Sequence, residues 1–224
     1  AEHVLSMFLS LSKSISSYDT EVRKGNFKSN ADKIQTFELL NKNILIAGFG
    51  RIGKKLISRC LAFDTNVYVY DPYVDEKIIK KFGGIKVDKI EDGLKKADYV
   101  SLHMPLTNET KNLINYSVLK TMKKNSIIIN TARGGNINEL ELEKALNEGL
   151  IFGAALDVFS KEPVEKDNPL LKNKKVILSP HSATFTDECT SRMGIETTKN
   201  IIDFFENKID KSMIVKLWLI LEEN

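Results

Sequence analysis

Short apolar runs alternate with amphipathic segments along most of the chain. Runs of this kind are typical of parallel strands that are buried on both faces of a sheet. They occupy residues 44–47, 67–70, 99–102, 126–130, 153–158 and 176–178. Patterns with helical spacing separate most of them, at residues 52–63, 74–82, 116–122 and 139–146. This alternation predicts an α/β fold, with a doubly wound parallel sheet that is covered by helices on both faces.

Helical patterns also flank this alternation at its two ends. From Val4 to Ile15, apolar residues recur at the spacing of one helix face, and Gly25-Asn26 ends the segment. A long helix is predicted from about residue 186 to residue 207. For the helix at 139–146, we expect Asn138 to be the N-cap and Gly149 to end it.

Composition and charge exclude several classes of protein. The 224 residues are 42% hydrophobic and 28% charged, which is ordinary for a globular chain. The net charge is only +3 and the lysines are dispersed, so we expect no nucleic-acid partner. The apolar runs at 4–11 and 213–221 are shorter than the roughly 20 residues that span a bilayer, and the first lacks the basic start of a signal peptide. We therefore expect no membrane partner.

The cysteines point to the compartment and against a metal site. Cys60 and Cys189 lie far apart, without a CxxC pair or a Cys/His cluster. They are interpreted as reduced thiols of a cytoplasmic protein, and no metal site is predicted.

The motif GFGRIG at residues 48–53 directly follows the first predicted strand and opens a helix. In this context, Gly48 permits a tight turn and Gly50 lets the backbone approach a pyrophosphate. Gly53 allows the helix to pack closely on the sheet. The next strand ends in Asp71, whose carboxylate would accept hydrogen bonds from a ribose and repel a 2′-phosphate. The motif predicts a dinucleotide site that prefers NAD to NADP, the alternative being a glycine-rich structural turn.

Three candidate catalytic residues follow the carboxyl ends of later strands, where doubly wound sheets bind ligands. They are Arg133, Glu162 and His181. An arginine can hold a carboxylate or a carbonyl oxygen, and a histidine paired with a carboxylate can exchange a proton with that oxygen. Together these groups could reduce a 2-keto acid. Taken singly, each of the three could instead be a structural residue. His103 could stack near an adenine or be structural, and we expect His3 to be structural.

These motifs, with HMPLT at 103–107, TARGG at 131–135, ALDVF at 155–159, Glu162-Pro163 and Pro180-His181, resemble the D-isomer-specific 2-hydroxyacid dehydrogenases. The resemblance extends from the first residue to about residue 215. It implies that Arg133, Glu162 and His181 are catalytic. It also implies an NAD site of the Rossmann type and a small 2-hydroxy or 2-keto acid as substrate. The residues that it assigns to the cofactor site are Gly48, Gly50, Arg51, Ile52, Gly53, Asp71, Met104, Thr131, Ala132, Arg133, Asp157, His181, Ser182 and Ala183.

The resemblance also suggests a domain organisation. Residues 1–40 are similar to the family's hinge and dimerisation helix with its arm, and residues 41–183 to its NAD-binding domain. Residues 184–224 correspond to a return helix and a remnant of the substrate domain. The upstream part of that substrate domain has no counterpart, and the apolar tail at 217–221 could contact it or a partner subunit. We therefore expect a homodimer through the opening helix, and a chain that binds NADH but turns over slowly by itself. The alternatives are a non-catalytic NAD-binding module and a truncated, inactive form.

Overall fold

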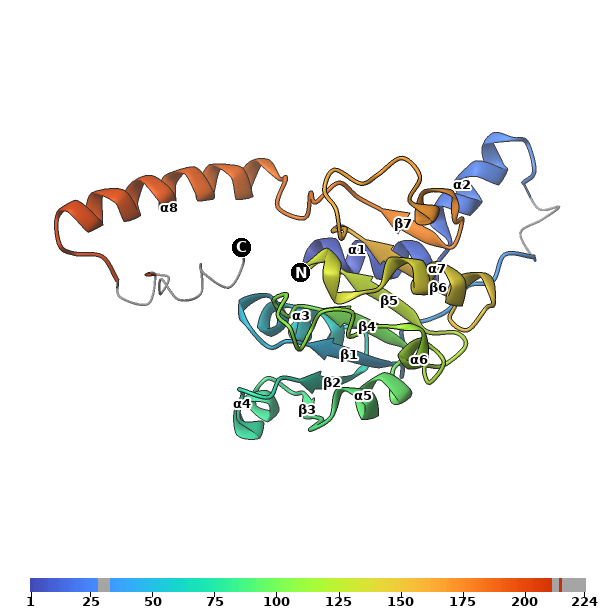
Figure 1. Cartoon of the computed structure of the whole chain (residues 1–224), viewed down its shortest axis with the longest axis horizontal. Coiled ribbons are helices and arrows are strands. Elements are labelled where there is room, and N and C mark those ends of the chain that lie inside the picture. Colours follow the sequence, from blue (N-terminus) through green and yellow to red (C-terminus); the bar gives the residue numbers. More distant parts are fainter. Residues whose placement is uncertain (28–32, 211–213, 215–224) are drawn as a thin grey trace. The chain divides into compact units, whose positions relative to one another are not determined.

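The computed structural model describes residues 1–27, 33–210 and 214. The chain divides into two compact units, Ala1–His181 and Ser182–Asn224. Among the described residues of the first unit, seven strands form one parallel sheet in the order β3-β2-β1-β4-β5-β6-β7 (Figure 1). The strands are β1 (Asn43–Ala47), β2 (Asn66–Tyr70), β3 (Ile85–Lys86), β4 (Tyr99–Leu102), β5 (Ile127–Asn130), β6 (Gly153–Leu156) and β7 (Val176–Leu178). The predicted doubly wound parallel sheet is confirmed.

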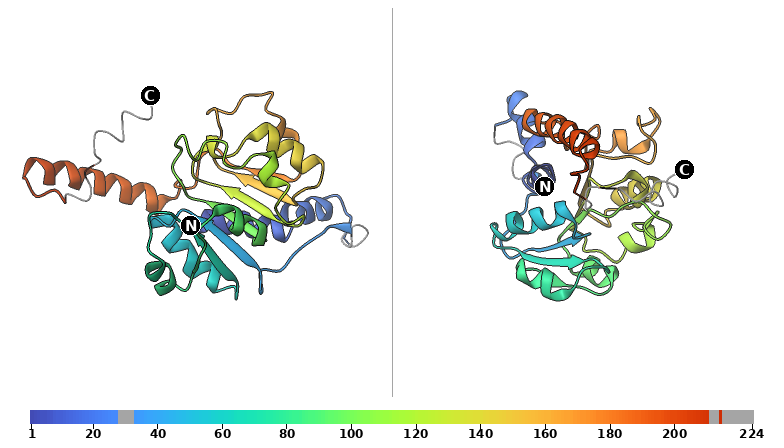
Figure 2. Two further views of the ribbon diagram at one scale, coloured as in Figure 1. Left: turned by 60° about the horizontal axis from the view of Figure 1, so that its bottom comes forward. Right: turned by 90° about the vertical axis from the view of Figure 1, so that its left-hand side faces the viewer.

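Helices cover both faces of this sheet (Figure 2). One face packs against α1 (Glu2–Ser12), α3 (Arg51–Leu61) and α4 (Glu76–Lys81). The other packs against α5 (Ile90–Lys96), α6 (Tyr116–Leu119) and α7 (Glu139–Asn147). The first unit also contains α2 (Ile15–Arg23) and the short 3-10 helices η2 (Gly134–Asn136) and η3 (Pro169–Lys172).

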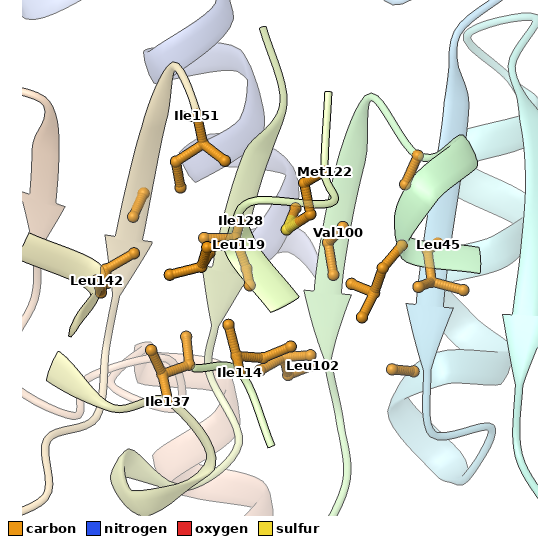
Figure 3. Packing of buried hydrophobic residues seen from close by; sticks show 14 of the residues in the cluster. Leu45, Val100, Leu102, Ile114, Leu119, Met122, Ile128, Ile137, Leu142 and Ile151 are labelled. Carbon is orange, nitrogen blue, oxygen red and sulfur yellow. The ribbon is translucent and has the colours of Figure 1, made fainter. Parts of the chain in front are cut away.

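The apolar runs become strands because both of their faces are buried. In β1, Leu45 and Ala47 belong to one hydrophobic cluster, whereas Ile44 and Ile46 belong to the other, and all four side chains are fully buried. Figure 3 shows the first cluster, in which Leu45 and its counterparts on neighbouring strands meet side chains of the covering helices. A strand that is buried on both faces needs apolar residues at every position, so it forms a continuous apolar run in the sequence.

The prediction of a single opening helix is wrong, because the structure has two helices, α1 and α2. Ser14 separates them with a left-handed backbone, at φ 49°. The carbonyl of Ser12 accepts a hydrogen bond from the Phe37 N–H (2.7 Å) and so is engaged by the returning chain. The Ser14 hydroxyl donates to the Gln35 carbonyl (3.0 Å). These long-range bonds compete with continuation of the helix.

Among the strands and α-helices of the described residues, β3 and α5 have no counterpart in the predicted elements. A strand of two residues leaves no periodic pattern, and α5 contains Gly93. A Cβ at Gly93 would lie only 2.7 Å from a Leu45 methyl group, so this glycine allows the helix to approach the sheet closely. The predicted strand at 153–158 ends earlier, at Leu156.

The helix caps agree with the sequence. The Asn138 side chain accepts a hydrogen bond from the Glu141 N–H, and Gly149 has a φ of +68° just after α7. In the second unit, α8 (Asp187–Phe205) begins after Thr186, whose side chain caps it by accepting from the Cys189 N–H. The apolar tail at 217–221 lies outside the described residues. None of the helices in the described ranges has the length and apolar character needed to cross a membrane.

Candidate active site

The strand order reverses between β1 and β4, and in open α/β sheets this is the place where ligands bind. Gly48 follows β1 and His103 follows β4. The two strand ends are joined by a hydrogen bond from the His103 N–H to the Ala47 carbonyl (2.7 Å). The GFGRIG loop therefore lies at the expected crevice.

The GFGRIG motif forms the fingerprint loop, residues 48–53. Its three glycines are needed for different structural reasons. Gly48 has a φ of +100°, and a Cβ there would lie 2.7 Å from the His103 carbonyl. A Cβ on Gly53 would lie 2.4 Å from the Gly48 carbonyl oxygen. A Cβ on Gly50 would meet nothing within 4 Å. The protein itself thus requires Gly48 and Gly53, whereas Gly50 leaves space open in front of the loop.

The open space faces the start of α3. Its N-cap is Gly50, which has no side chain with which to cap the helix. The first N–H groups of a helix lack partners within the helix and attract anions. These features fit the pyrophosphate of a dinucleotide. Arg51 and Ile52, the other predicted contacts, begin this helix and are exposed.

Asp71 has a structural role that the sequence did not reveal. Its Oδ2 accepts a hydrogen bond from the Phe49 N–H (2.7 Å), and its Oδ1 accepts one from the Tyr73 N–H (2.9 Å). The carboxylate therefore holds the fingerprint loop against the end of β2. A carboxylate oxygen can accept more than one hydrogen bond, so these contacts are compatible with binding a ribose.

His103 and Met104, which follow β4, are largely packed inside the protein. The Met104 side chain belongs to the first hydrophobic cluster, and its carbonyl accepts from Asn136 Nδ2 (3.1 Å). His103 Nε2 lies 2.8 Å from the Ser101 hydroxyl, and its Nδ1 is buried without a hydrogen-bond partner. Burial, helped by the N-terminal charge, lowers the pKa of His103 to about 4, so the imidazole is neutral near pH 7.

The turn after β5 is shaped by a buried asparagine. Asn130 Oδ1 accepts from the Ala132 N–H (3.0 Å), and Asn130 Nδ2 donates to the Arg133 carbonyl (2.8 Å). This fixes Thr131, Ala132 and Arg133, although sequence reasoning did not single out Asn130. The exposed Arg133 side chain donates from Nη1 to the Ala132 carbonyl (2.8 Å). Asn130 thus positions the backbone of Arg133, whose guanidinium folds back onto the preceding carbonyl group.

Glu162 and His181 form a direct pair. His181 Nδ1 lies 2.8 Å from Glu162 Oε2, while Glu162 Oε1 accepts from the Phe159 N–H (2.9 Å). Burial acts to raise the pKa of the Glu162 carboxyl. The hydrogen bonds from His181 and Phe159, together with the charge of His181, outweigh it and hold that pKa below its ordinary value. An ionised Glu162 can only accept, so Nδ1 carries the proton of this hydrogen bond, and Nε2 is the ring nitrogen that the pair leaves available.

His181 itself has an unusual backbone. Its φ is +53°, in the left-handed region, and its N–H donates to the Asp157 carbonyl (2.7 Å). Non-glycine residues in this region are uncommon and are found where the surrounding structure holds them. The strand ends of β6 and β7 therefore fix the direction in which the imidazole leaves the chain.

A second histidine reaches the same strand ends from α1. The Asp157 side chain is fully buried, and its Oδ1 accepts from the Ser179 hydroxyl (2.5 Å). His3 Nε2 lies 3.0 Å from that hydroxyl and 3.5 Å from Asp157 Oδ1. Because Ser179 donates its one proton to Asp157, His3 donates to Ser179. His3 thus contacts Ser179 and Asp157 at these strand ends, and the expectation that it is structural stays a prediction.

The topology brings the predicted catalytic residues to one edge. Strands β5, β6 and β7 are neighbours, and Asn130 pairs with Leu156, which pairs with Leu178. Arg133, Glu162 and His181 all follow these aligned ends. Ser182 and Ala183 begin the second unit, and their assignment to the cofactor site stays a prediction.

Comparison with known proteins identifies the family. Residues 5–183 match the family described as D-isomer specific 2-hydroxyacid dehydrogenase, NAD binding domain. The chain belongs to this family. It is 36% identical over 214 residues to the D-3-phosphoglycerate dehydrogenase of Methanocaldococcus jannaschii, a match that covers 96% of this chain and 40% of that protein. It is 34% identical over 216 residues to the glyoxylate reductase of Korarchaeum cryptofilum, covering 96% of this chain and 65% of that protein.

Solved structures that are similar to this chain agree with the fold. The D-lactate dehydrogenase of Aquifex aeolicus, complexed with NAD and lactic acid, is 32% identical, with a TM-score of 0.83 over 92% of this chain and 66% of that one. An acyclic imino acid reductase in complex with NADPH and D-Arg is 30% identical, with a TM-score of 0.83 over 93% of this chain and 65% of that one. The chain therefore spans between two fifths and two thirds of the length of these similar proteins.

Proposed function

We propose that this chain forms the NAD-binding and proton-transferring part of a D-2-hydroxyacid dehydrogenase. The enzyme would interconvert a D-2-hydroxy acid and its 2-keto acid. The observation that carries the proposal is the 2.8 Å pair between His181 Nδ1 and Glu162 Oε2, after strands β6 and β7, whose carboxyl ends lie on the same edge of the sheet as the fingerprint loop. Family membership and the names of the relatives support it.

The residues present fit NAD. The open space at Gly50 and the uncapped start of α3 would receive the pyrophosphate, and Asp71 would accept hydrogen bonds from the adenosine ribose. The negative charge of Asp71 disfavours a 2′-phosphate, which supports NAD over NADP. When bound, the nicotinamide ring supplies or accepts the hydride. Thr131, Ala132 and Asp157 would border it, by resemblance to the family.

His181 would act as the acid and base. In the reducing direction, Nε2 gives a proton to the carbonyl oxygen of the keto acid, and in the oxidising direction it removes the hydroxyl proton. Glu162 keeps Nδ1 protonated and the ring oriented. Arg133 would leave its bond with Ala132 and hold the substrate carboxylate with its fork of donors.

Substitution of His181 tests this proposal. In the enzyme that carries this chain, we expect His181→Gln to lower kcat by about 100-fold or more, the range of general acid–base catalysis, and to leave NADH affinity within a few-fold. Steady-state assays with a panel of 2-keto acids, together with a fluorescence titration of NADH, measure both quantities. Unchanged kcat would contradict the role of His181. Loss of NADH binding together with kcat would show that His181 serves mainly to hold the cofactor, and would contradict its role as the acid and base.

Assembly and compartment complete the proposal. We expect a homodimer through the N-terminal helices, which is supported by the exposed side chains of Ile15 and Val22 on α2, a helix with no buried residue. Light scattering over a range of concentrations checks this, and a monomer throughout would contradict it. The free thiols of Cys60 and Cys189 support a cytoplasmic location.

A further inference from the structure

The loop that carries Glu162 is held at both of its ends by one carboxylate, that of Glu139. The loop connects β6 with η3 and contains residues 159–168. Near its start, the Ser160 N–H donates to Glu139 Oε1 (2.5 Å). Near its end, Asn168 Nδ2 donates to Glu139 Oε2 (2.6 Å). The two oxygens of Glu139 thus bind both ends of the segment that contains Glu162.

Glu139 lies at a position in α7 that suits an acidic side chain. Glu139 is the first residue of that helix and is half-buried. The partial positive charge at a helix start stabilises a carboxylate there. Hydrogen bonds to an ionised acceptor are about twice as strong as neutral ones. Glu139 is therefore a stronger anchor for the loop than an amide or a hydroxyl would be.

A second contact fixes the same loop against the turn that carries Arg133. A Cβ on Gly134 would lie 1.9 Å from the Phe159 carbonyl carbon. The two backbones therefore touch at this point, and Gly134 has no room for a side chain. Phe159 N–H is the donor to Glu162 Oε1, and the next residue, Ser160, donates to Glu139. Consecutive N–H groups of one segment thus bind Glu162 and Glu139.

A competing anchor inside the loop is weaker. Lys161 Nζ lies 2.5 Å from Glu165 Oε1, but the two side chains are 70% and 55% exposed. Exposed ion pairs contribute between about 0 and 1 kcal/mol to stability. The hydrogen bonds to Glu139, by contrast, tie the loop to helix α7.

We propose that Glu139 is a positioning residue that holds Glu162 in place to orient His181. This inference rests on the proposed function, because it extends the role of the Glu162–His181 pair. Glu139 acts through the loop, by fixing Ser160 and Asn168, and it does not touch the reacting atoms. When Glu139 is lost, the loop moves and the pair between Glu162 and His181 loosens.

The pKa of the Glu162 carboxyl reports whether the pair with His181 has loosened. We would follow the Glu162 carboxyl by ¹³C NMR through a pH titration of the 224-residue chain, in wild type and Glu139→Ala. The charged groups that face Glu162 are His181, which lowers its pKa, and Asp157, which raises it. If the loop loosens, the pKa of Glu162 rises towards its ordinary value. Removal of a neighbouring negative charge by itself would lower that pKa, so the sign of the change separates positioning from simple electrostatics.

Two further variants make the test decisive. Glu143→Ala is the matched control, because Glu143 lies on the same helix and its carboxylate accepts a hydrogen bond from Asn147, a residue of the helix itself. Asn168→Ser removes the amide donor without a change of charge and keeps an N-cap oxygen for the Leu170 N–H. We expect no change in Glu143→Ala, and a rise in the pKa of Glu162 in Asn168→Ser that is smaller than in Glu139→Ala. If Glu139→Ala does not fold, Asn168→Ser decides.

The outcome is also independent of cofactor binding. With three histidines in the chain, the ring signals of His181 can be assigned and should move together with the Glu162 titration. NADH binding should be unchanged in Glu139→Ala, since the fingerprint loop is untouched. A wild-type chain that fails to bind NADH would contradict the proposed function but leave the Glu162 readout intact. Folded variants with an unchanged Glu162 titration and unchanged His181 signals would overturn the role of Glu139.

Discussion

Side chains at the ends of β5, β6 and β7 carry the proposed chemistry, and backbone groups hold them there. Asn130 shapes the turn before Arg133, and the Asp157 carbonyl holds the N–H of His181. Glu162 accepts from one backbone N–H and pairs with His181 through its other oxygen. Preorganisation of this kind lets an acid–base pair act without rearranging for each turnover.

The lowered pKa of Glu162 predicts how stability depends on pH. A carboxyl whose pKa is lower in the folded state stabilises the fold above its unfolded pKa, and this contribution is lost as the pH falls through its folded pKa. We therefore expect Glu162→Gln to destabilise the chain at neutral pH, but not under acidic conditions in which wild-type Glu162 is protonated. Because the Glu162 side chain is 38% exposed, the difference should be about 1 kcal/mol or less.

Urea unfolding of wild type and Glu162→Gln at a series of pH values measures this difference. Glu165→Gln is a suitable control, because Glu165 is exposed and its charged partner is Lys161. A gap between wild type and Glu162→Gln that widens as the pH falls would contradict the assigned direction of the pKa shift.

The sequence was informative at these positions only where a residue type implies its chemistry. Glycines at fixed spacing, a strand-end aspartate and the Arg, Glu and His set have this property. Asn130, Glu139 and Ser179 are polar residues of types that also occur on ordinary surfaces. Their roles depend on partners that are distant in sequence, such as Asn168 for Glu139 and Asp157 for Ser179. Such pairs are visible only once the strands are aligned.

At the scale of elements, caps and close approaches decide where helices begin and end. Helix α7 matters most, because it begins with Glu139, and Asn138 caps it through a hydrogen bond from the Glu141 N–H (3.2 Å). The turn from η2 into α7 follows Arg133 directly. The Asn138 cap therefore stabilises the segment that links Arg133 to Glu139.

Removal of this cap should weaken the fold measurably. We expect Asn138→Ala to lower the free energy of unfolding by about 1 kcal/mol, the typical cost of losing an N-cap side chain. Chemical denaturation measures the loss. Asn147→Ala, at the other end of the same helix, removes side-chain bonds that are exposed and should cost less. Equal losses in the two variants would show that the cap is not the cause.

Element prediction succeeded where burial imposes a pattern and failed where tertiary contacts override it. Strands buried on both faces were found from their apolar runs. The break between α1 and α2 was missed because the Phe37 N–H, more than 20 residues away, binds the carbonyl of Ser12. Helix α5 was missed because Gly93 belongs to its contact with the sheet, whereas glycine ordinarily argues against a helix.

At the scale of the molecule, the strand order explains why the site is where it is. The reversal between β1 and β4 opens a crevice at the fingerprint, and the ends of β5 to β7 continue along the same edge. The fold class could be predicted because alternating strands and helices admit few right-handed topologies. We propose that this edge binds NAD at the fingerprint loop, and the other proposed roles depend on it.

A titration of NADH into wild type and Gly50→Ala tests that claim most directly. A Cβ at Gly50 meets nothing in the protein, so Gly50→Ala should lose at most about 1 kcal/mol of stability, as a change of N-cap residue. The same Cβ would occupy the space reserved for the pyrophosphate. Gly194→Ala, a helical position that is also open, serves as the control. We predict saturable NADH binding by wild type and Gly194→Ala, and at least about tenfold weaker binding by a folded Gly50→Ala. Equal affinity in Gly50→Ala, or no saturable binding by wild type, would contradict the account.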